Sequence, residues 1–233
     1  MTETLVREPP LPGVSLEPSF LLEAPDTLPA DGRRKKLDQY FTPPALAEAA
    51  VGWLVRDGYA WSGPGWDGMA ALEPSAGRGA WIDALLKAVP DASCAALDID
   101  PERVGDLQRR GIDAEVGDFL TAELFSAYTH GRYDLILGNP PYSGAEEHTR
   151  RALELRSRFG SVAFLLRLAF LESAERVGFW KEHPASKIYV LSERPSFSGG
   201  GTDNSAYGFF VWSTWHRGPT QTEVVQWKKP RDT

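Results

Sequence analysis

The sequence predicts an α/β fold built on a doubly wound, mostly parallel sheet with helices on both faces. Short apolar runs alternate along the chain with amphipathic stretches of helical period, the pattern of strands joined by helical crossovers. Polar turns follow several of these runs, at the carboxyl ends where open α/β sheets bind ligands. With 233 residues and 42% hydrophobic content, one domain can bury an independent core.

The apolar runs predict seven strands, at residues 69–72, 93–97, 112–116, 133–137, 162–168, 187–191 and 207–212. Thr42 suits the N-cap of a first helix, Pro43 suits its first position, and Gly58 suits its end. Helical spacing predicts further helices over residues 80–89, 101–110, 146–159 and 172–183. Because residues 192–206 lack a helical pattern, we expect the last two strands to form an antiparallel hairpin at one end of the sheet.

The N-terminal stretch, residues 1–36, is rich in proline and has no apolar periodicity. It predicts a flexible tail ahead of a single domain over residues 37–233. The N-terminus lacks the basic and apolar regions of a signal peptide, and no apolar run approaches the ~20 residues that span a bilayer. With a single cysteine, Cys94, the chain is expected in a reducing cytoplasm, without disulfides and without a membrane partner.

The formal net charge of −7 argues against a protein that wraps nucleic acid indiscriminately. Basic residues nevertheless cluster at Arg33–Lys36, at Arg150 and Arg151, and near the C-terminus. Clusters of this kind are usually solvated surface. Charge therefore neither requires nor excludes a partner that bears phosphates.

The tetrapeptide Asn139–Pro140–Pro141–Tyr142 follows the apolar run at residues 133–137. Two consecutive prolines exclude helix and make the turn stiff, so it can aim an amide and a phenol ring into a cleft. An ordinary turn is the alternative, because turns favour Asn and Pro for their own reasons.

Acidic and small residues follow three other predicted strands. Glu73 opens the turn Glu73–Gly79 before a helix, Asp98 ends the second strand, and Asp118 and Phe119 end the third. The turn contains the pair Gly77-x-Gly79 but not the three glycines of the dinucleotide-binding fingerprint. A dinucleotide is therefore the weaker interpretation of the ligand. The set instead suits a ligand with a cationic amine, ribose hydroxyls and an exocyclic amine on a ring. Taken singly, each residue could be a cap, a turn or core residue.

Together these motifs resemble the class I S-adenosylmethionine-dependent methyltransferases, which have a Rossmann-like sheet. More narrowly, they resemble the adenine-specific DNA amino-methyltransferases whose cofactor motifs precede the tetrapeptide. The resemblance begins with Gln39–Pro44, covers about residues 38–213 and includes Leu165–Arg167, Glu193–Phe197 and Tyr207–Trp212. It implies methyl transfer from S-adenosyl-L-methionine to the N6 amine of adenine in DNA. Small proteins of this pattern are familiar from phages, prophages and restriction-modification systems.

The resemblance also implies roles for individual residues. The implied cofactor-binding residues are Tyr40, Thr42, Pro43, Glu73, Ala76, Gly77, Asp98, Ile99, Asp118, Phe119, Asn139 and Pro141. Asn139 and the Pro140 carbonyl would accept the hydrogens of the target amine, beside Tyr142, which would stack on the base. Phe197 would offer a second ring, and Arg150 and Arg151 would contact phosphates. A base in a duplex would have to be flipped out.

Several alternatives stay open at this point. Release-factor glutamine methyltransferases and some RNA guanine methyltransferases carry the same tetrapeptide, and a non-catalytic nucleic-acid binder could share the fold. Cys94 lies within an apolar run and is expected to be an inert core thiol. The histidines, His130, His148, His183 and His216, lack metal-ligand spacing and are expected at the surface, so no metal is predicted.

About twenty residues follow Trp212, too few for a separate target-recognition domain. Specificity is therefore expected to be short or relaxed, or to be supplied by a partner subunit, and a homo-oligomer is possible. The polar loop Ser196–Asn204 could touch the base or its flanking phosphates, although an ordinary Gly-rich connection is the simpler interpretation for Gly199–Gly201.

Overall fold

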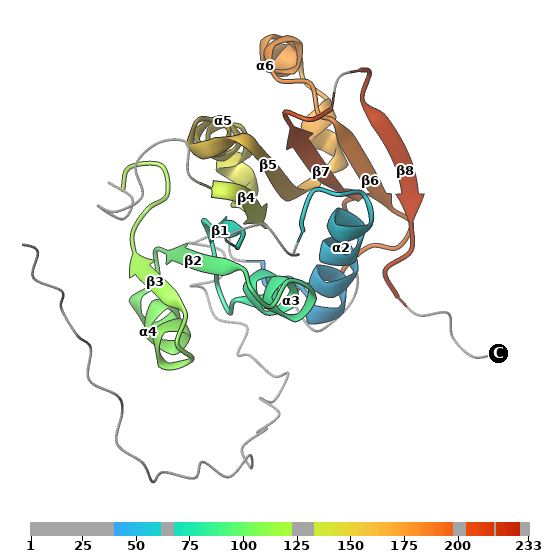
Figure 1. Ribbon diagram of the computed structural model, residues 1–233. Coiled ribbons are helices and arrows are strands. Elements are labelled where there is room, and N and C mark those ends of the chain that lie inside the picture. The colour runs from blue at the N-terminus through green and yellow to red at the C-terminus, as the bar shows by residue number, and fades with distance from the viewer. Residues whose placement is uncertain (1–39, 62–67, 123–132, 198–203, 217, 229–233) are drawn as a thin grey trace, which may run out of the picture.

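A computed structural model describes residues 40–61, 68–122, 133–197, 204–216 and 218–228 (Figure 1). These residues form one mixed sheet of eight strands. In spatial order the strands are β3 (Asp113–Val116), β2 (Ser93–Asp98), β1 (Ala70–Glu73), β4 (Tyr133–Gly138), β5 (Arg156–Arg167), β7 (Tyr207–Ser213), β6 (Lys187–Leu191) and β8 (Gln221–Val225). The predicted α/β class is confirmed. The predicted N-terminal tail and the basic cluster Arg33–Lys36 lie outside the described residues.

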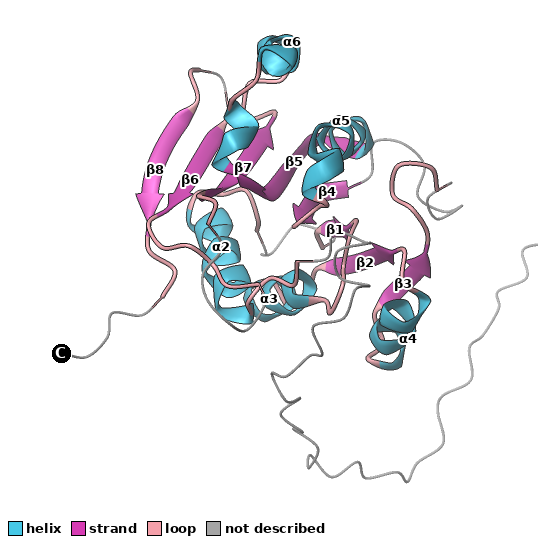
Figure 2. Ribbon diagram, turned by 180° about the vertical axis from the view of Figure 1, so that it is seen from behind, coloured by secondary structure: helices cyan, strands magenta, loops and turns pink. Residues whose placement is uncertain are grey.

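Helices cover both faces of the sheet (Figures 1 and 2). On one face lie α2 (Pro44–Arg56), α3 (Ala80–Ala88) and α4 (Pro101–Arg109), and on the other lie α5 (Ala145–Leu155) and α6 (Val177–Glu182). Successive side chains of a strand point to opposite faces. Leu135 and Leu137 accordingly pack in the core of α2 and α3, while Ile136 packs in the core of α5 and α6. No described helix is long and apolar enough to span a membrane.

The chain reverses its direction of travel across the sheet between β1 and β4. β1 pairs in parallel with β2 on one side and with β4 on the other, so the sheet has a switch point there. Open α/β sheets form a crevice at such a point, outside the carboxyl ends of the strands. The polar turns after β1, β2 and β4 therefore meet at one edge of the sheet.

The antiparallel part of the sheet is larger than a terminal hairpin. β7 pairs antiparallel with β6, as predicted, but also with β5, and β8 then continues the sheet in parallel with β6. The strand β8 was not predicted. It lies at the edge of the sheet with Val225 as its one buried residue, so it has no alternating pattern to reveal it.

Two predicted helices are shorter in the structure. The stretch 146–159 leaves the helix at Arg156, where β5 begins with an irregular pairing to β4. Gly160 approaches β4 so closely that an added Cβ would lie 2.5 Å from the Tyr133 carbonyl oxygen. The stretch 172–183 contains only the 3-10 turn η3 (Ala174–Arg176) and the six residues of α6.

The first helix also begins differently from the prediction. Pro43 is its N-cap and Pro44 its first residue, without a side-chain cap. Thr42 is not the N-cap; its buried hydroxyl accepts a hydrogen bond from Trp81 Nε1 at 3.2 Å. Gly58 ends the helix with φ +77°, as predicted. Thr42 thus ties the segment before α2 to α3 rather than capping a helix.

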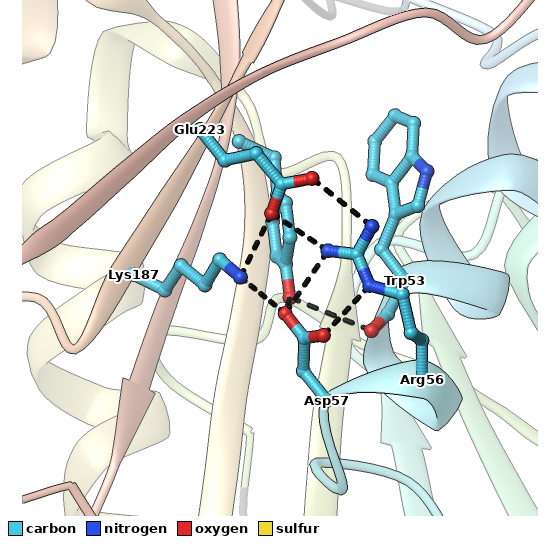
Figure 3. A network of polar contacts seen from close by, with 6 residues as sticks. Trp53, Arg56, Asp57, Lys187 and Glu223 are labelled. Carbon is cyan, nitrogen blue, oxygen red and sulfur yellow. Dashed lines mark hydrogen bonds and ion pairs between the residues drawn. The ribbon is translucent and has the colours of Figure 1, made fainter.

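A charged network fixes the other end of α2 against the sheet (Figure 3). Asp57 pairs with Arg56 and with Lys187 of β6, and accepts a hydrogen bond from the Tyr189 hydroxyl at 2.6 Å. Glu223 of β8 joins it through Arg56 at 2.7 Å and Lys187 at 2.8 Å. These contacts between α2, β6 and β8 hold the helix whose N-terminal side borders the site described next.

Candidate active site

A pocket of about 360 Å³ lies at the carboxyl ends of β1, β2, β3 and β4. The predicted site residues that line it are Tyr40, Gly77, Asp98, Ile99, Asp118, Phe119, Asn139 and Pro141. The predicted residues Thr42, Pro43, Glu73, Ala76, Pro140, Tyr142, Phe197, Arg150 and Arg151 lie outside its wall. Residues of four strand ends therefore meet in one cavity, although they are far apart in the sequence.

Asp98 forms a rigid part of the pocket wall. One carboxylate oxygen accepts from the Gly77 backbone amide at 2.6 Å and the other from the Asp100 amide at 2.9 Å. Its side chain is buried, and burial raises the pKa of the carboxyl, while these two hydrogen bonds act in the opposite direction. Because each carboxylate oxygen has two lone pairs, Asp98 can still accept hydrogen bonds from a ligand in the pocket.

The glycine turn after β1 is packed against the segment before α2. Gly77 has φ +53°, and an added Cβ would lie 3.3 Å from the Phe41 ring, so glycine suits both the conformation and the close approach. The guanidinium carbons of Arg78 and Arg103 lie 5.0 and 5.5 Å from the centre of that ring. Phe41 is a pocket residue that the motifs did not single out.

Glu73 lies behind this turn rather than in the pocket wall. Its carboxylate accepts from the Ile82 amide at 3.3 Å, near the start of α3, and the side chain is fully buried. Burial raises the pKa of Glu73 well above its ordinary value. In this structure Glu73 links β1 to α3, and its contact with a cofactor stays a prediction.

The amide of Asn139 has a defined orientation. Its nitrogen donates to the Tyr40 carbonyl oxygen at 2.9 Å, and because a carbonyl only accepts, the amide oxygen must face the other way. That oxygen is buried and has no hydrogen-bond partner among the described residues. A buried acceptor without a partner is costly, and here it belongs to a residue of the pocket wall.

Tyr142 and Phe197 belong to an aromatic cluster beside the pocket. The Tyr40 ring lies 5.0 Å from Tyr142 and 5.6 Å from Phe197, and Tyr207 contacts the same two rings at 5.7 and 5.2 Å. Arg167 stacks its guanidinium 4.8 Å from the centre of the Tyr142 ring. Burial raises the pKa of Tyr142 well above its ordinary value. The fold thus brings the two predicted base-stacking rings together against Tyr40.

No protein-family model matches the chain. Among curated proteins, the Type II methyltransferase M.HincII of Haemophilus influenzae is 25% identical over 112 residues, 48% of this chain. The Type II methyltransferase M.CvrRI of a Paramecium bursaria Chlorella virus is 38% identical over 73 residues, 30% of this chain. Each alignment covers 18% of the relative, so the chain matches less than a fifth of their length.

Solved structures with low sequence identity share the fold. A Listeria monocytogenes protein assigned to the class I S-adenosylmethionine-dependent methyltransferases matches 82% of this chain and 66% of its own, with TM-score 0.56 and 14% identity. An Agrobacterium tumefaciens protein assigned as an O-methyltransferase matches 80% and 86%, with TM-score 0.53 and 14% identity. The chain has the class I S-adenosylmethionine-dependent methyltransferase fold.

This fold implies S-adenosyl-L-methionine as the cofactor, and the pocket fits it. Asp98 presents a fixed carboxylate at the end of β2, where it can accept from both hydroxyls of a ribose. Ile99 and Phe119 add apolar walls of the kind that an adenine ring packs against.

The two arginines after the tetrapeptide are engaged within the methyltransferase fold. Arg150 pairs with Glu146 and Glu182, each at 3.1 Å. Arg151 donates to the backbone carbonyls of Leu120 at 3.1 Å and Ala122 at 2.6 Å, after β3. Both contacts stabilise the chain itself, and the phosphate role of these arginines stays a prediction.

One histidine was placed wrongly. His148 of α5 is buried and lines the pocket, with its ring 5.6 Å from Phe119 and Nδ1 2.8 Å from the Gly144 carbonyl oxygen. It lies one helical turn after Gly144, which ends the short turn η1 (Tyr142–Gly144) that begins at the last residue of the tetrapeptide, and this spacing is the signal that could have revealed it. Cys94 is partly buried at the margin of the core, and burial raises the pKa of its thiol to about 12; that this thiol is inert stays a prediction. The described residues contain no cluster suited to a metal.

Proposed function

We propose that this protein transfers a methyl group from S-adenosyl-L-methionine to the N6 amine of adenine in DNA. The observation that carries the proposal is the Asn139 amide, whose oxygen is buried at the pocket wall without a partner while its nitrogen is held by the Tyr40 carbonyl. An acceptor kept unpaired at such a position suits a substrate N–H group. An exocyclic amine of a base supplies one.

The chemistry follows from the weakness of that amine as a nucleophile. Its lone pair is delocalised into the base, and accepting its two N–H hydrogens localises the pair on nitrogen. Asn139 Oδ1 accepts one hydrogen and the Pro140 carbonyl the other, and both sit on a turn made stiff by two prolines. The bound cofactor supplies an electrophilic methyl group. Tyr142 and Phe197 stack on the target base once it has flipped out of the DNA duplex.

Three features favour DNA over the other substrates of this fold class. The Phe41–Pro44 and Arg194–Phe197 segments resemble the DNA adenine enzymes, and the relatives are named Type II methyltransferases. The partly exposed rings of Tyr40 and Tyr142 also suit a planar base better than a glutamine side chain. Specificity is short or relaxed, or comes from a partner.

A side-by-side transfer assay tests the proposal. The protein is incubated with labelled S-adenosyl-L-methionine and with duplex DNA, single-stranded DNA, RNA and protein separately, and the products are digested for nucleoside mass spectrometry. We expect label in DNA as N6-methyladenine. Label confined to RNA or protein, or to another base, would overturn the substrate assignment.

A further inference from the structure

His148 is buried at one end of the pocket and is absent from the machinery described above. It is 6% exposed, and its ring packs against Phe119 at 5.6 Å. Asp118 and Gly144 line the pocket beside it. Phe119 and Asp118 are the residues expected to contact the adenine ring of the cofactor. His148 therefore lies at the expected adenine-binding end of the pocket.

The hydrogen bond of His148 determines its tautomer. Nδ1 lies 2.8 Å from the Gly144 carbonyl oxygen, which can only accept, so Nδ1 carries the proton. Burial lowers the pKa of the imidazole, which leaves the ring neutral at pH 7 and above. In a neutral ring with a proton on Nδ1, Nε2 has a free lone pair and is an acceptor. Nε2 makes no hydrogen bond to any described residue.

Charged groups around the ring do not change this state. Asp118 after β3 and Glu147 on α5 both act to raise the pKa of His148, but burial is the larger effect. Arg151 lies over the Phe119 ring at 5.6 Å and is bonded to backbone carbonyls. Asp98 lines the same pocket. One oxygen of Asp118 accepts from the Leu120 amide at 2.9 Å. Because a 6-amino group has two N–H donors, His148 can accept one of these hydrogens while the other oxygen of Asp118 accepts the second.

We propose that His148 Nε2 accepts a hydrogen bond from the 6-amino group of the cofactor's adenine and so selects adenine over a 6-oxopurine. This inference rests on the proposed function, since it places S-adenosyl-L-methionine in the pocket. An amino group presents N–H donors to the Nε2 lone pair. A 6-oxo group presents lone pairs instead, which leaves two acceptors facing each other without a proton between them.

Binding calorimetry with S-adenosylhomocysteine and S-inosylhomocysteine tests the proposal without turnover. At pH 7.5 we expect the intact protein to bind the adenine ligand on the order of 10-fold more tightly or better, the usual result of leaving a buried acceptor unpaired. The ratio of the two affinities is the readout. Asp98 and Asp118 face both ligands, so their contribution does not depend on His148.

Two substitutions separate the two ring nitrogens. His148→Asn keeps a nitrogen near the Nδ1 position to donate to Gly144 but removes Nε2, so the preference for adenine should fall roughly 3- to 10-fold. His148→Gln keeps a polar group near the Nε2 position. Its amide can present either oxygen or nitrogen, so the 6-oxo ligand should gain affinity while the adenine ligand is retained.

A pH series on the unsubstituted protein provides a second measurement if a variant does not fold. Below the lowered pKa of His148 the ring is protonated and Nε2 becomes a donor, so the preference for adenine should shrink once the pH falls below that pKa. An unchanged ratio in His148→Asn and through the titration of His148 would overturn the role of His148 and leave the proposed function standing. Failure of the intact protein to bind either ligand would overturn both.

Discussion

We predict that Asn139→Ala lowers the rate of methyl transfer much more than it lowers the affinity for the cofactor. The substitution removes an acceptor aimed at the place where charge changes during the reaction. Loss of one such preorganised group typically lowers kcat by about 100- to 1,000-fold. It also removes the 2.9 Å bond to the Tyr40 carbonyl, a neutral hydrogen bond worth about 0.5–1.5 kcal/mol. Cofactor affinity should therefore fall by no more than about 10-fold.

The assay combines single-turnover transfer of labelled methyl to DNA with calorimetric measurement of cofactor binding. Asn139→Asp is the matched control, because it has the same size and keeps an oxygen for the amine while losing the donor to Tyr40. We expect the Asp variant to transfer methyl faster than the Ala variant. Transfer by Asn139→Ala within 10-fold of the unsubstituted rate would refute the reasoning, and so would an equal loss in rate and cofactor affinity.

Four further substitutions test how the site is supported, each measured by urea unfolding. Thr42→Val removes the acceptor of the Trp81 indole, and leaving that buried N–H unpaired should destabilise the protein by about 1–3 kcal/mol. Burial raises the pKa of Glu73, so the folded protein loses stability as the pH rises and this carboxyl ionises. Glu73→Gln should therefore raise the free energy of unfolding more at pH 8 than at pH 5. A stability difference that does not change with pH would contradict this. Asp57→Ala should cost about 1–3 kcal/mol because it leaves buried polar partners unpaired, whereas the more exposed Glu223→Ala should cost under about 1 kcal/mol; equal losses would contradict the difference in burial.

Local signals were sufficient for most of the fold and for the pocket wall. The predicted strands from residue 69 to residue 137 differ from the observed ones by about one residue at each end, because each is closed by Gly, Pro or Asp and all but the strand at 112–116 are short apolar runs. Asp98, Asp118 and Asn139 were placed at strand ends by the same runs. A parallel sheet then brings such ends to one edge.

Local sequence patterns were enough to specify an α/β sheet with polar turns at one edge, because hydrophobic periodicity and turn residues act between near neighbours. The edge strand β8, the early start of β5, the burial of His148 and the direction of the Asn139 amide depend on contacts across the folded chain. That direction depends on a carbonyl 99 residues earlier in the chain. Contacts between residues so far apart produce no periodic pattern in the sequence. The residues around each partner fit their own strand, helix or turn whether or not the contact forms.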